Sequence, residues 1–378
     1  MIEFKKGDLY MASKVYFTDL RASFKKNLLS KLTMLLESVN LKDIIPPRSL
    51  VAIKLHFGET GNLAFIRPNF IRRIVDYTKE LRASPFLTDT NTLYAGTRGN
   101  SVSHLNTAIE NGFAYAVVNA PIIIADGLRG ASFEEVEIDK HIFRTAFIGK
   151  EIFGADALIS VAHFKGHEVS GFGGTIKNLG MGCASRKGKL QQHSGLSPRM
   201  NRKKCVGCGD CVQHCGQGAI SLADKKAVID QQRCVGCGEC IIICPNKAID
   251  VRWSSDTSLF QKKMVEYAFA ALKGKKGRSV FLNFLIHISP DCDCAPFNDA
   301  PIVRDIGIMA SLDPVAIDQA SVDMVNRQTP LDNSCLEGRN MIDDDKFRGI
   351  HPEIDWSIQL RYAEEIGLGN RDYELIII

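Results

Sequence analysis

The run Ala157-Leu-Ile-Ser-Val-Ala-His163 is the clearest signal of the fold in this chain of 378 residues. It is apolar almost throughout and closes on a histidine. A short continuous apolar run is typical of a strand that is buried on both faces of a parallel sheet. Further runs have the same character: Ser49–Leu55, Pro85–Thr88, Ala114–Val118, Ile122–Ala125 and Val280–Ile286. We therefore expect each of these runs to form a buried strand.

Amphipathic segments separate these runs: Ser23–Val39, Pro68–Leu81, Ser101–Asn111 and Leu259–Leu272. Pro68 and Ser101 stand where the first turn of a helix favours such residues. Strands that alternate with helices are typical of the α/β class. The sequence thus predicts a mostly parallel sheet with helices on its faces.

The composition is that of an ordinary soluble protein, with 45% hydrophobic and 24% charged residues. A net charge of +4 is small for this length and gives no reason to expect nucleic acid. The longest apolar stretch, Ala114–Ala125, is shorter than the roughly 20 residues that span a bilayer. The N-terminus has neither an apolar core segment nor a cleavage site. We expect a cytoplasmic protein without a membrane or nucleic-acid partner.

Eight of the twelve cysteines fall in one duplicated segment. The groups Cys205–Cys215 and Cys234–Cys244 both have the spacing C-x2-C-x2-C-x3-C. In this spacing three thiolates face one iron–sulfur cube, and the fourth reaches the other cube. We therefore expect two [4Fe–4S] clusters. The ligands of cluster one are Cys205, Cys208, Cys211 and Cys244, and those of cluster two are Cys234, Cys237, Cys240 and Cys215.

Two zinc sites are the alternative, because C-x2-C pairs also bind zinc. The segment 201–251 resembles bacterial-type two-cluster ferredoxins, although Gly216 replaces the proline that usually follows the fourth cysteine. The α/β pattern resumes after Trp253, so the segment is read as an insertion. The expected organisation is an α/β domain formed by residues 1–196 and 253–378, interrupted by a small α+β ferredoxin-like domain at 197–252.

Polar side chains follow several of the predicted strands. In open parallel sheets, ligands bind outside the carboxyl ends of the strands. The side chains at these positions include His56 and Glu59, Asp89, Asp126, His163, Lys165 and His167, and His287, Asp291, Cys292 and Cys294. Polar side chains at the ends of so many strands favour a ligand-binding site at one rim of the sheet. The catalytic candidates are His167, His163, Lys177 and Asp89.

The stretch from His163 to His193 is the densest in such residues. Its glycines, Gly171, Gly173 and Gly174, allow the backbone to approach a bound cofactor closely. If a helix begins near Thr175, its N-terminus and Lys177 favour an anion such as phosphate. No Walker loop or dinucleotide fingerprint is present. We expect a phosphate-bearing cofactor here, although turns alone also use glycines.

A second metal is a further expectation. Cys292 and Cys294 alternate on an extended segment and so face the same side, and Cys183 could join them. His193 is another candidate ligand. The alternative is that these cysteines are small buried side chains, which is the role we assign to Cys335.

Several phrases resemble those of domain-of-unknown-function family 362, whose members often carry an inserted two-cluster ferredoxin. The phrases are Lys54-Leu-His-Phe-Gly-Glu59, Leu87-Thr-Asp-Thr-Asn-Thr-Leu-Tyr94, His163-Phe-Lys-Gly-His167, Gly171-Phe-Gly-Gly174 and Lys177-Asn-Leu-Gly-Met-Gly-Cys183. The resemblance covers nearly the whole chain. It implies an architecture, because the family has no agreed reaction.

The segment from His167 to Lys177, followed by His193, is also similar to a stretch of nickel-pincer lactate racemases. The resemblance implies that His167 is a proton-transfer base, that Lys177 tethers the pincer nucleotide and that His193 binds nickel. It covers about 30 residues, and those enzymes lack an inserted ferredoxin.

The leading hypothesis is an iron–sulfur oxidoreductase that passes electrons to a substrate or cofactor at the sheet rim. Its electrons would come from a redox partner protein such as a ferredoxin, a flavodoxin or a reductase. One alternative is an electron carrier or cluster scaffold without catalysis of its own. Another is a metal–nucleotide-dependent isomerase or epimerase.

Overall fold

The computed structural model describes residues 12–94, 96–193, 198–215, 217–234, 238–250, 256–339 and 341–378, with the side chain of Ile342 excepted. The predicted domain boundaries at 197 and 252 fall outside these ranges, so the division into domains stays a prediction. Among the described residues, no helix is long and apolar enough to cross a membrane.

The strands and helices are as follows. The strands are β1 (Ser13–Asp19), β2 (Leu50–Lys54), β3 (Ser84–Asp89), β4 (Ile122–Ile124), β5 (Phe133–Glu137), β6 (Thr145–Gly149), β7 (Ala157–His163), β8 (Lys165–His167), β9 (Gly171–Gly173), β10 (Arg199–Met200), β11 (Ile220–Ala223), β12 (Lys226–Ile229), β13 (Ile249–Asp250), β14 (Ser279–Leu285), β15 (Gly307–Ser311) and β16 (Tyr373–Ile377). The helices are α1 (Leu28–Ser38), α2 (Leu41–Ile44), α3 (Pro68–Glu80), α4 (Ser101–Ala108), α5 (Tyr115–Val118), α6 (Lys150–Gly154), α7 (Thr175–Gly180), α8 (Arg186–His193), α9 (Asp210–Gln213), α10 (Glu239–Ile243), α11 (Thr257–Leu272), α12 (Pro314–Asn326), α13 (Lys346–Ile350) and α14 (Ser357–Glu365), with a π-helical turn at Ile109–Phe113 and a 3-10 turn at Ile342–Asp344.

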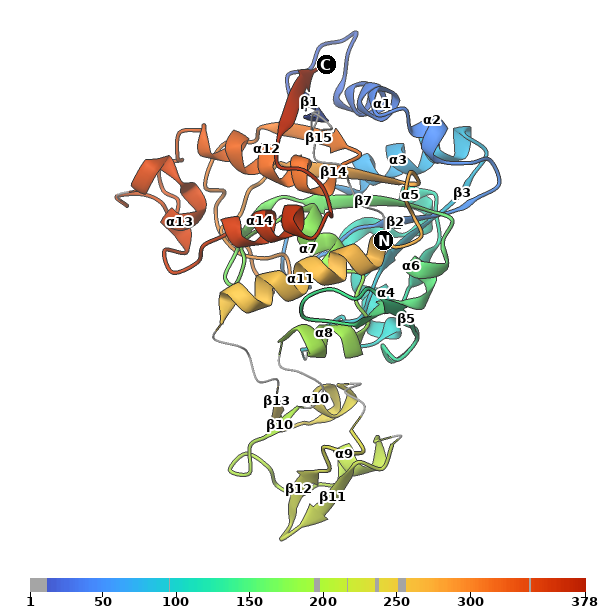
Figure 1. The fold of residues 1–378 in the computed structure, drawn as a ribbon, viewed down its shortest axis with the longest axis vertical. Helices are drawn as coiled ribbons and strands as arrows, with labels where there is room; N and C mark the ends of the chain where they lie inside the picture. The colour runs from blue at the N-terminus through green and yellow to red at the C-terminus, as the bar shows by residue number, and fades with distance from the viewer. Residues whose placement is uncertain are drawn as a thin grey trace.

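One eight-stranded sheet organises the chain, with the strand order β16-β1-β15-β14-β7-β2-β3-β4 (Figure 1). The pairs β14–β7, β7–β2, β2–β3 and β3–β4 are parallel, whereas β15 is antiparallel to both of its neighbours. The prediction of an α/β fold with a mostly parallel sheet is confirmed. The parallel half is the one that the apolar runs predicted.

One predicted strand is wrong. Within the run Ala114–Val118, residues Tyr115–Val118 form the short helix α5, which follows a turn at Gly112 (φ 88°) and ends at Asn119 in the left-handed region (φ 59°). Tyr115 and Val117 are exposed, so the run is not a buried strand. A short apolar run has no periodicity that separates one helical turn from a strand.

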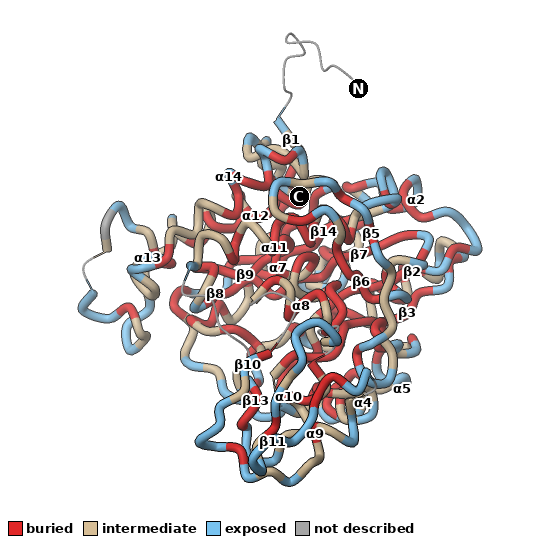
Figure 2. The backbone as a smooth tube through the Cα atoms, turned by 60° about the horizontal axis from the view of Figure 1, so that its bottom comes forward, coloured by how far each residue is buried: buried red, intermediate tan, exposed pale blue. Residues whose placement is uncertain are grey.

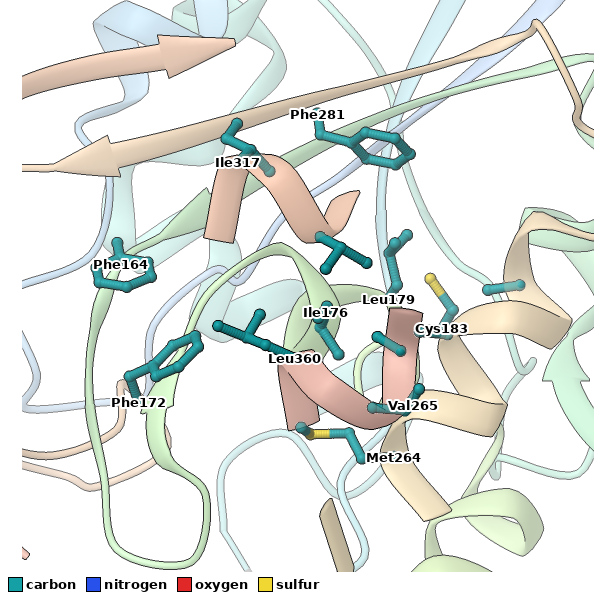
Figure 3. Packing of buried hydrophobic residues seen from close by; sticks show 14 of the residues in the cluster. Phe164, Phe172, Ile176, Leu179, Cys183, Met264, Val265, Phe281, Ile317 and Leu360 are labelled. Carbon is teal, nitrogen blue, oxygen red and sulfur yellow. The ribbon is translucent and has the colours of Figure 1, made fainter. Parts of the chain in front are cut away.

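Both faces of the sheet are covered, which is why its central strands are apolar in most positions. Along β7, Leu158 packs on the side of α7, α11 and α12, while Ile159 packs on the side of α1 and α3. Figure 2 shows the buried residues gathered along these central strands and helices. Figure 3 shows the first of the two cores, where Ile176 and Leu179 of α7 meet Met264 and Val265 of α11. This packing holds α7 against the sheet.

The described residues of the cysteine segment (residues 198–250) form short elements, namely the hairpin β11–β12, the pair β10–β13 and helices α9 and α10. In Figure 1 it lies below α8 and α11, with α10 on the side nearer to α8. Its small core contains Cys205, Cys211 and Cys240 together with Leu93 and Leu190 from the α/β part.

Candidate functional site

A cavity of about 380 Å³ lies at the carboxyl ends of the parallel strands, and we call it the rim cavity. It is lined by residues of the segments 54–56, 89–98, 162–169, 177–193 and 292–294 and by Phe260. Strands β2, β3, β7 and β14 end beside it or lead into it. The sequence candidates that line it are Asp89, His163, His167, Lys177, His193, Cys292 and Cys294.

The walls of the rim cavity carry an excess of positive charge. Among the described lining residues there are five cationic side chains and two carboxylates. The cations are Lys54, Arg98, Lys165, Lys177 and Lys189, and the carboxylates are Asp89 and Glu168. Burial lowers the pKa of Lys189 to about 8, so Lys189 begins to lose its charge just above neutral pH. The remaining excess favours a ligand with anionic groups.

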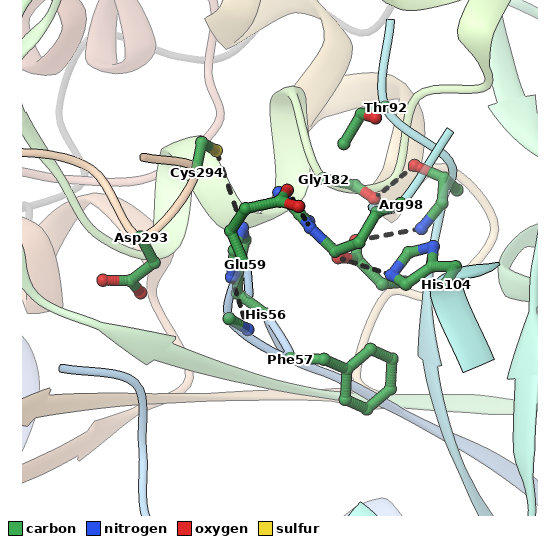
Figure 4. A network of polar contacts seen from close by, with 12 residues as sticks. His56, Phe57, Glu59, Thr92, Arg98, His104, Gly182, Asp293 and Cys294 are labelled. Atoms are coloured by element: carbon green, nitrogen blue, oxygen red, sulfur yellow. Dashed lines mark hydrogen bonds and ion pairs between the residues drawn. The ribbon is translucent and has the colours of Figure 1, made fainter. Parts of the chain in front are cut away.

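Lys177 begins a chain of polar contacts that crosses the cavity wall. Its Nζ donates to Cys292 Sγ at 2.7 Å, and Cys292 Sγ lies 3.2 Å from Cys294 Sγ. Cys294 Sγ lies 3.5 Å from His56 Nε2, a contact visible in Figure 4. The S–H of Cys292 and the nearby Lys177 and His56 hold the pKa of Cys294 well below its usual value, although burial opposes this. Cys294 is therefore the thiolate of the pair.

The Lys177 ammonium gains from the same arrangement. Burial alone lowers the pKa of a lysine. Here the neighbouring thiols and Glu168 outweigh burial and raise the pKa of Lys177 above its ordinary value. Lys177 is therefore a permanent cation, and its ammonium group faces the sulfur atom of Cys292.

His167 is fixed as a neutral ring. Its Nδ1 accepts from the backbone N–H groups of Val169 and Ser170 at 3.2 and 3.1 Å, so Nε2 carries the proton. Burial and the Lys177 charge lower the pKa of His167 to about 3. Nε2 lies 3.7 Å from Glu168 Oε1 at the cavity wall. A neutral imidazole with an N–H towards the cavity can donate a proton to a bound molecule and take it back.

His193 lies at the end of α8 and stacks on Phe260, with the ring centroids 4.9 Å apart. Burial lowers its pKa to about 3, so it is also neutral. The neutral form is the one that binds metals.

His163 is held differently from the other two histidines. Its Nδ1 lies 2.8 Å from Asp293 Oδ1, and its Nε2 lies 2.9 Å from the carbonyl oxygen of Ile286. Lys165 Nζ donates to the carbonyl oxygen of His163 and lies 3.7 Å from the other Asp293 oxygen. Both ring nitrogens therefore face oxygen atoms of the protein. The arrangement positions the 292–294 loop against β7.

Asp89 belongs to a buried ion-pair network (Figure 4). Lys54 Nζ lies 3.0 Å from one of its oxygens, and Arg98 Nη1 lies 3.5 Å from the other. Arg98 also pairs with Glu59 at 3.0 Å and donates to the Tyr94 hydroxyl at 2.6 Å. Burial alone would raise the pKa of Asp89, but Lys54 and the nearby cationic groups hold it far below its usual range. Asp89 is a permanent anion that organises Lys54 and Arg98, so it is unsuited to act as a base.

The expected helix at Thr175 exists, but its N-terminus is occupied by the protein itself. The backbone N–H groups of Thr175 and Ile176 donate to the two oxygens of the Asp318 carboxylate at 2.7 and 2.8 Å. The expectation that these N–H groups bind a phosphate is therefore wrong, because a buried carboxylate already fills the anion position. An anionic ligand in the cavity would instead meet lysine and arginine side chains.

The three glycines make room for side chains of the protein. A Cβ atom on Gly171 (φ 76°) would lie 2.5 Å from Trp356 Cβ, and one on Gly174 would lie 2.3 Å from Asp318 Oδ1. A Cβ on Gly173 would lie 2.8 Å from Lys177 Cδ. Among these contacts only that of Gly173 involves Lys177, and none of the three glycines lines the rim cavity.

The three cysteines proposed as a second metal site do not come together. Cys183 lies in the hydrophobic core against Leu179 (Figure 3), and burial raises its pKa to about 11. Only Cys292 and Cys294 reach the rim cavity. Within the described ranges, no group of three or more His, Cys, Asp or Glu side chains is arranged to hold a metal ion.

The cysteine segment contains two small hollows, each lined by cysteines from both repeats. The first hollow is lined by Cys205, Cys208, Cys211 and Cys244. The second is lined by Cys215, Cys234 and Cys240. Cys237, the remaining predicted ligand of cluster two, lies outside the described residues. In each hollow the fourth cysteine of one repeat joins described cysteines of the other repeat, namely Cys205, Cys208 and Cys211 in the first hollow and Cys234 and Cys240 in the second.

Backbone amides point at several of these sulfurs. The N–H groups of Ala227, Ala219 and Ala248 donate to Cys205, Cys215 and Cys244 at 3.4, 3.2 and 3.2 Å. The Ala227 N–H is the main reason that the pKa of Cys205 is lowered. Burial and the nearby sulfurs of Cys208, Cys244 and Cys205 raise the pKa of Cys211.

The second hollow adjoins the rim cavity. Glu239, next to Cys240, pairs with buried Arg186 of α8 at 2.7 Å and with Arg129 at 2.5 Å. Gly238 packs against Leu93, which also lines the rim cavity. Leu93 is therefore a shared wall between the cysteine segment and the cavity.

Several lining residues were not among the sequence candidates, namely Lys54, Arg98, Glu168 and Lys189. Lys54 gave a signal, because a lysine at the end of an otherwise apolar strand is buried only with a partner. Arg98 lies in a loop and Lys189 on a short polar helix, where a charged residue is unremarkable from sequence alone.

Comparison with known proteins identifies the family. The family model described as "Domain of unknown function (DUF362)" matches residues 51–323. The chain therefore belongs to this family. No curated protein matches the chain.

Chains in solved structures also match, among them the lactate racemase apoprotein from Thermoanaerobacterium thermosaccharolyticum. The identity is 14%, the TM-score is 0.39, and the match covers 72% of this chain and 50% of that chain. This chain thus spans half the length of the racemase chain.

Proposed function

We propose that this chain is an iron–sulfur oxidoreductase that holds two [4Fe–4S] clusters in the cysteine segment and uses their electrons on an anionic small molecule in the rim cavity. The observation that carries the proposal is the crosswise grouping of the cysteines. Cys244 of the second repeat lines the same hollow as Cys205, Cys208 and Cys211 of the first. Two independent zinc sites, each formed within one repeat, do not require this exchange.

The donor set fits cubane clusters in two further respects. A single ion needs ligands that converge on one point, whereas each iron of a cubane takes one cysteine, so the thiolates surround a hollow. Amide N–H groups near the sulfurs stabilise the negative charge of a thiolate-bound cluster. The clusters would supply electrons one at a time.

The charge of the rim cavity supports an anionic substrate or cofactor. Lys177 and Arg98 are cations that stay charged across the physiological pH range, and Lys54 is paired with Asp89 on the same wall. His167 Nε2–H supplies a neutral proton donor next to them. These residues would bind and orient the molecule, and His167 would move its proton.

The contact through Leu93 supports an electron path between the two regions, because it places a residue of the second hollow's core on the cavity wall. At the first hollow, Cys208 and Val206 are exposed beside Lys203 and Lys204. An exposed thiol with an apolar neighbour and surrounding lysines suits the docking of an acidic redox protein such as a ferredoxin, a flavodoxin or a reductase.

Anaerobic purification followed by iron and acid-labile sulfide analysis tests the proposal. We expect about eight irons and as many sulfides per chain, with visible absorbance that bleaches on reduction. A colourless protein with tetrahedral zinc would contradict the proposal.

A separate experiment tests the claim that the rim cavity binds an anionic small molecule. Small molecules released by denaturing the anaerobic protein are analysed by negative-ion mass spectrometry. An anion released by the wild type should be lost in Lys177→Ala and kept in Lys42→Ala, whose lysine is exposed on α2. Iron content should be the same in all three proteins. Retention of the anion by Lys177→Ala would mean that the rim cavity is not its site.

A second candidate is an isomerase or epimerase with a metal–nucleotide cofactor, since Lys177, His167 and His193 line the same cavity. It predicts a covalent adduct on Lys177 in protein from the native host. An unmodified intact mass would count against it. The hydrogen bond from Lys177 to Cys292 favours the oxidoreductase, because it engages the lysine with a thiol.

A further inference from the structure

Two thiols of the rim cavity stand next to each other at one position of its wall. Cys292 and Cys294 are separated by one residue, and their sulfurs are 3.2 Å apart. A disulfide bond is about 2.05 Å long, so the two sulfurs need to approach by little more than an ångström. Cys292 is buried, whereas Cys294 is half-buried at the cavity surface.

The neighbours of this pair favour thiol chemistry over metal binding. The Lys177 ammonium is 2.7 Å from Cys292 Sγ and repels a cation placed between the sulfurs. His56 Nδ1 accepts the N–H of Gly58 at 2.9 Å, so His56 Nε2 carries the proton that faces Cys294. A metal would need that nitrogen as a bare acceptor. An N–H donor and an ammonium instead stabilise a thiolate, the form that exchanges with disulfides.

We propose that Cys292 and Cys294 form a redox-active dithiol that alternates with an intramolecular disulfide and serves as the two-electron station of the rim cavity. In reduction the S–S bond breaks, two electrons enter, Cys292 takes one proton and Cys294 leaves as a thiolate. The proton comes from solvent by way of the Lys177 ammonium. In oxidation the same electrons and proton leave, and the S–S bond forms again.

The iron–sulfur clusters of the proposed function are the donors of these electrons, and in this respect the inference rests on that function. One-electron donors and a two-electron substrate need an intermediate store, and a dithiol in the cavity that Leu93 also lines would provide one. The formation of the disulfide itself does not require the clusters, so the two proposals can fail separately.

The first experiment tests the disulfide by chemical oxidation. Anaerobic protein is treated with diamide, and the remaining thiols are alkylated with iodoacetamide before peptide mass spectrometry. The peptide with Cys292 and Cys294 should be lighter by two hydrogens and unalkylated, and dithiothreitol should restore two alkylation sites. Alkylation of both cysteines after diamide, or their conversion to sulfinic acids, would overturn the inference.

Matched variants make this result specific. In Cys292→Ser and Cys294→Ser the remaining cysteine should be alkylated after mild oxidation and reduction, and no internal bridge should form. Cys335→Ser, which removes a half-buried cysteine away from the rim cavity, should behave as the wild type. A bridge that persists in Cys294→Ser would show a different partner and would also overturn the inference.

The second experiment measures the electron link. Diamide-oxidised wild type and Cys292→Ser are titrated with photoreduced deazaflavin while the cluster absorbance is followed. The wild type should take up two more electron equivalents per chain than the variant, and equal end points would overturn the link. If the protein holds no iron, the proposed function fails, while the diamide result still decides whether the dithiol exists.

Discussion

The cysteine segment and the rim cavity both present reactive sulfur, but they control it by different means. In the cysteine segment the sulfurs of Cys205, Cys215 and Cys244 accept backbone N–H groups. In the rim cavity the backbone N–H of Cys294 donates to Cys292 Sγ at 3.4 Å, but the other contacts of the two sulfurs come from side chains, the Lys177 ammonium of α7 and the His56 imidazole just after β2. The amides of Ala219 and Ala248 lie four residues from their cysteines and that of Ala227 lies 22 residues away, whereas Lys177 is 115 residues from Cys292.

This difference decides what each region can do. Amides are fixed dipoles that no change of pH removes, so they suit a permanently bound group. Side chains carry protons, so they suit thiols that change their state. We expect the cysteine segment to be sensitive to loss of a ligand and the rim cavity to be sensitive to charge.

The largest expected effect concerns crosswise ligation in the cysteine segment. Either Cys205→Ser or Cys244→Ser should remove about half of the iron, because each breaks the same cluster. The double variant should lose no more than either single one, whereas Cys234→Ser with Cys244→Ser should lose nearly all. Iron and sulfide analysis per chain provides the measurement. Additive losses for Cys205 and Cys244 would place the two residues in different clusters.

The contact between the two regions provides the next test. Arg186 has no exposed surface and pairs with Glu239, whereas Arg129 pairs with the same carboxylate with 57% of its side chain exposed. Arg186→Met leaves a largely buried carboxylate without its main partner and should lower the free energy of unfolding by about 3–5 kcal/mol. Arg129→Met should cost about 0–1 kcal/mol. Anaerobic urea unfolding followed by circular dichroism compares them, and equal losses would contradict the difference in burial.

The pH dependence of the free energy of unfolding should depend in part on Asp318, which caps the helix that carries Lys177. Burial raises its folded-state pKa to about 6, above its ordinary value of 3.8. The stability that it contributes is therefore complete below the unfolded pKa and is lost as the pH rises through about 6. In the wild type this loss should be about 1–3 kcal/mol between pH 4 and 7. Asp318→Asn should lack that part of the pH dependence.

Urea unfolding of the wild type and Asp318→Asn at several pH values measures the difference between them. Asp126, whose pKa burial also raises to about 6, is present in both proteins and cancels. Parallel curves for the two proteins would mean that Asp318 does not titrate in this range. Iron content should not differ, because Asp318 lies in α12, away from the cysteine segment.

The smallest expected effect is kinetic. Alkylation of Cys294 by iodoacetamide should become fast at a lower pH than alkylation of Cys335, because the pKa of Cys294 is lowered and burial raises that of Cys335. Lys177→Met should move the Cys294 profile to higher pH and leave the Cys335 profile in place. Quantitative peptide mass spectrometry over a pH series gives both profiles. Identical alkylation profiles for Cys294 and Cys335 in the wild type would contradict the expected difference between their pKa values.

The sequence predicted the parallel half of the sheet well, because strands buried on both faces leave a continuous apolar run, as at Ala157–His163. It did not predict β1, β15 and β16, which complete the sheet. Polar residues interrupt the apolar pattern of β1 and β16, and β15 is a run of only five residues that begins with glycine and ends with serine. The helix at 115–118 was mistaken for a strand because one turn is too short to show a helical period.

The candidate site was predictable where residues follow a strand directly, since the fold brings the ends of parallel strands together. Asp89, His163 and His167 were found in this way. Arg98 and Lys189 reach the cavity from a loop and from α8, and only the tertiary fold places them there. The phosphate expectation failed because Asp318, distant in sequence, caps the helix that carries Lys177.

The helix α8 has a consequence for how this protein responds to air. Its first residue, Arg186, is fastened to Glu239 beside Cys240, and its later residues Lys189 and His193 form part of the cavity wall. Oxidative damage to an iron–sulfur centre held by Cys240 would weaken the ion pair between Arg186 and Glu239. Helix α8, with Lys189 and His193, would then move as a unit. A molecule bound among the lysines would then be released without ever having touched a cysteine of the repeat.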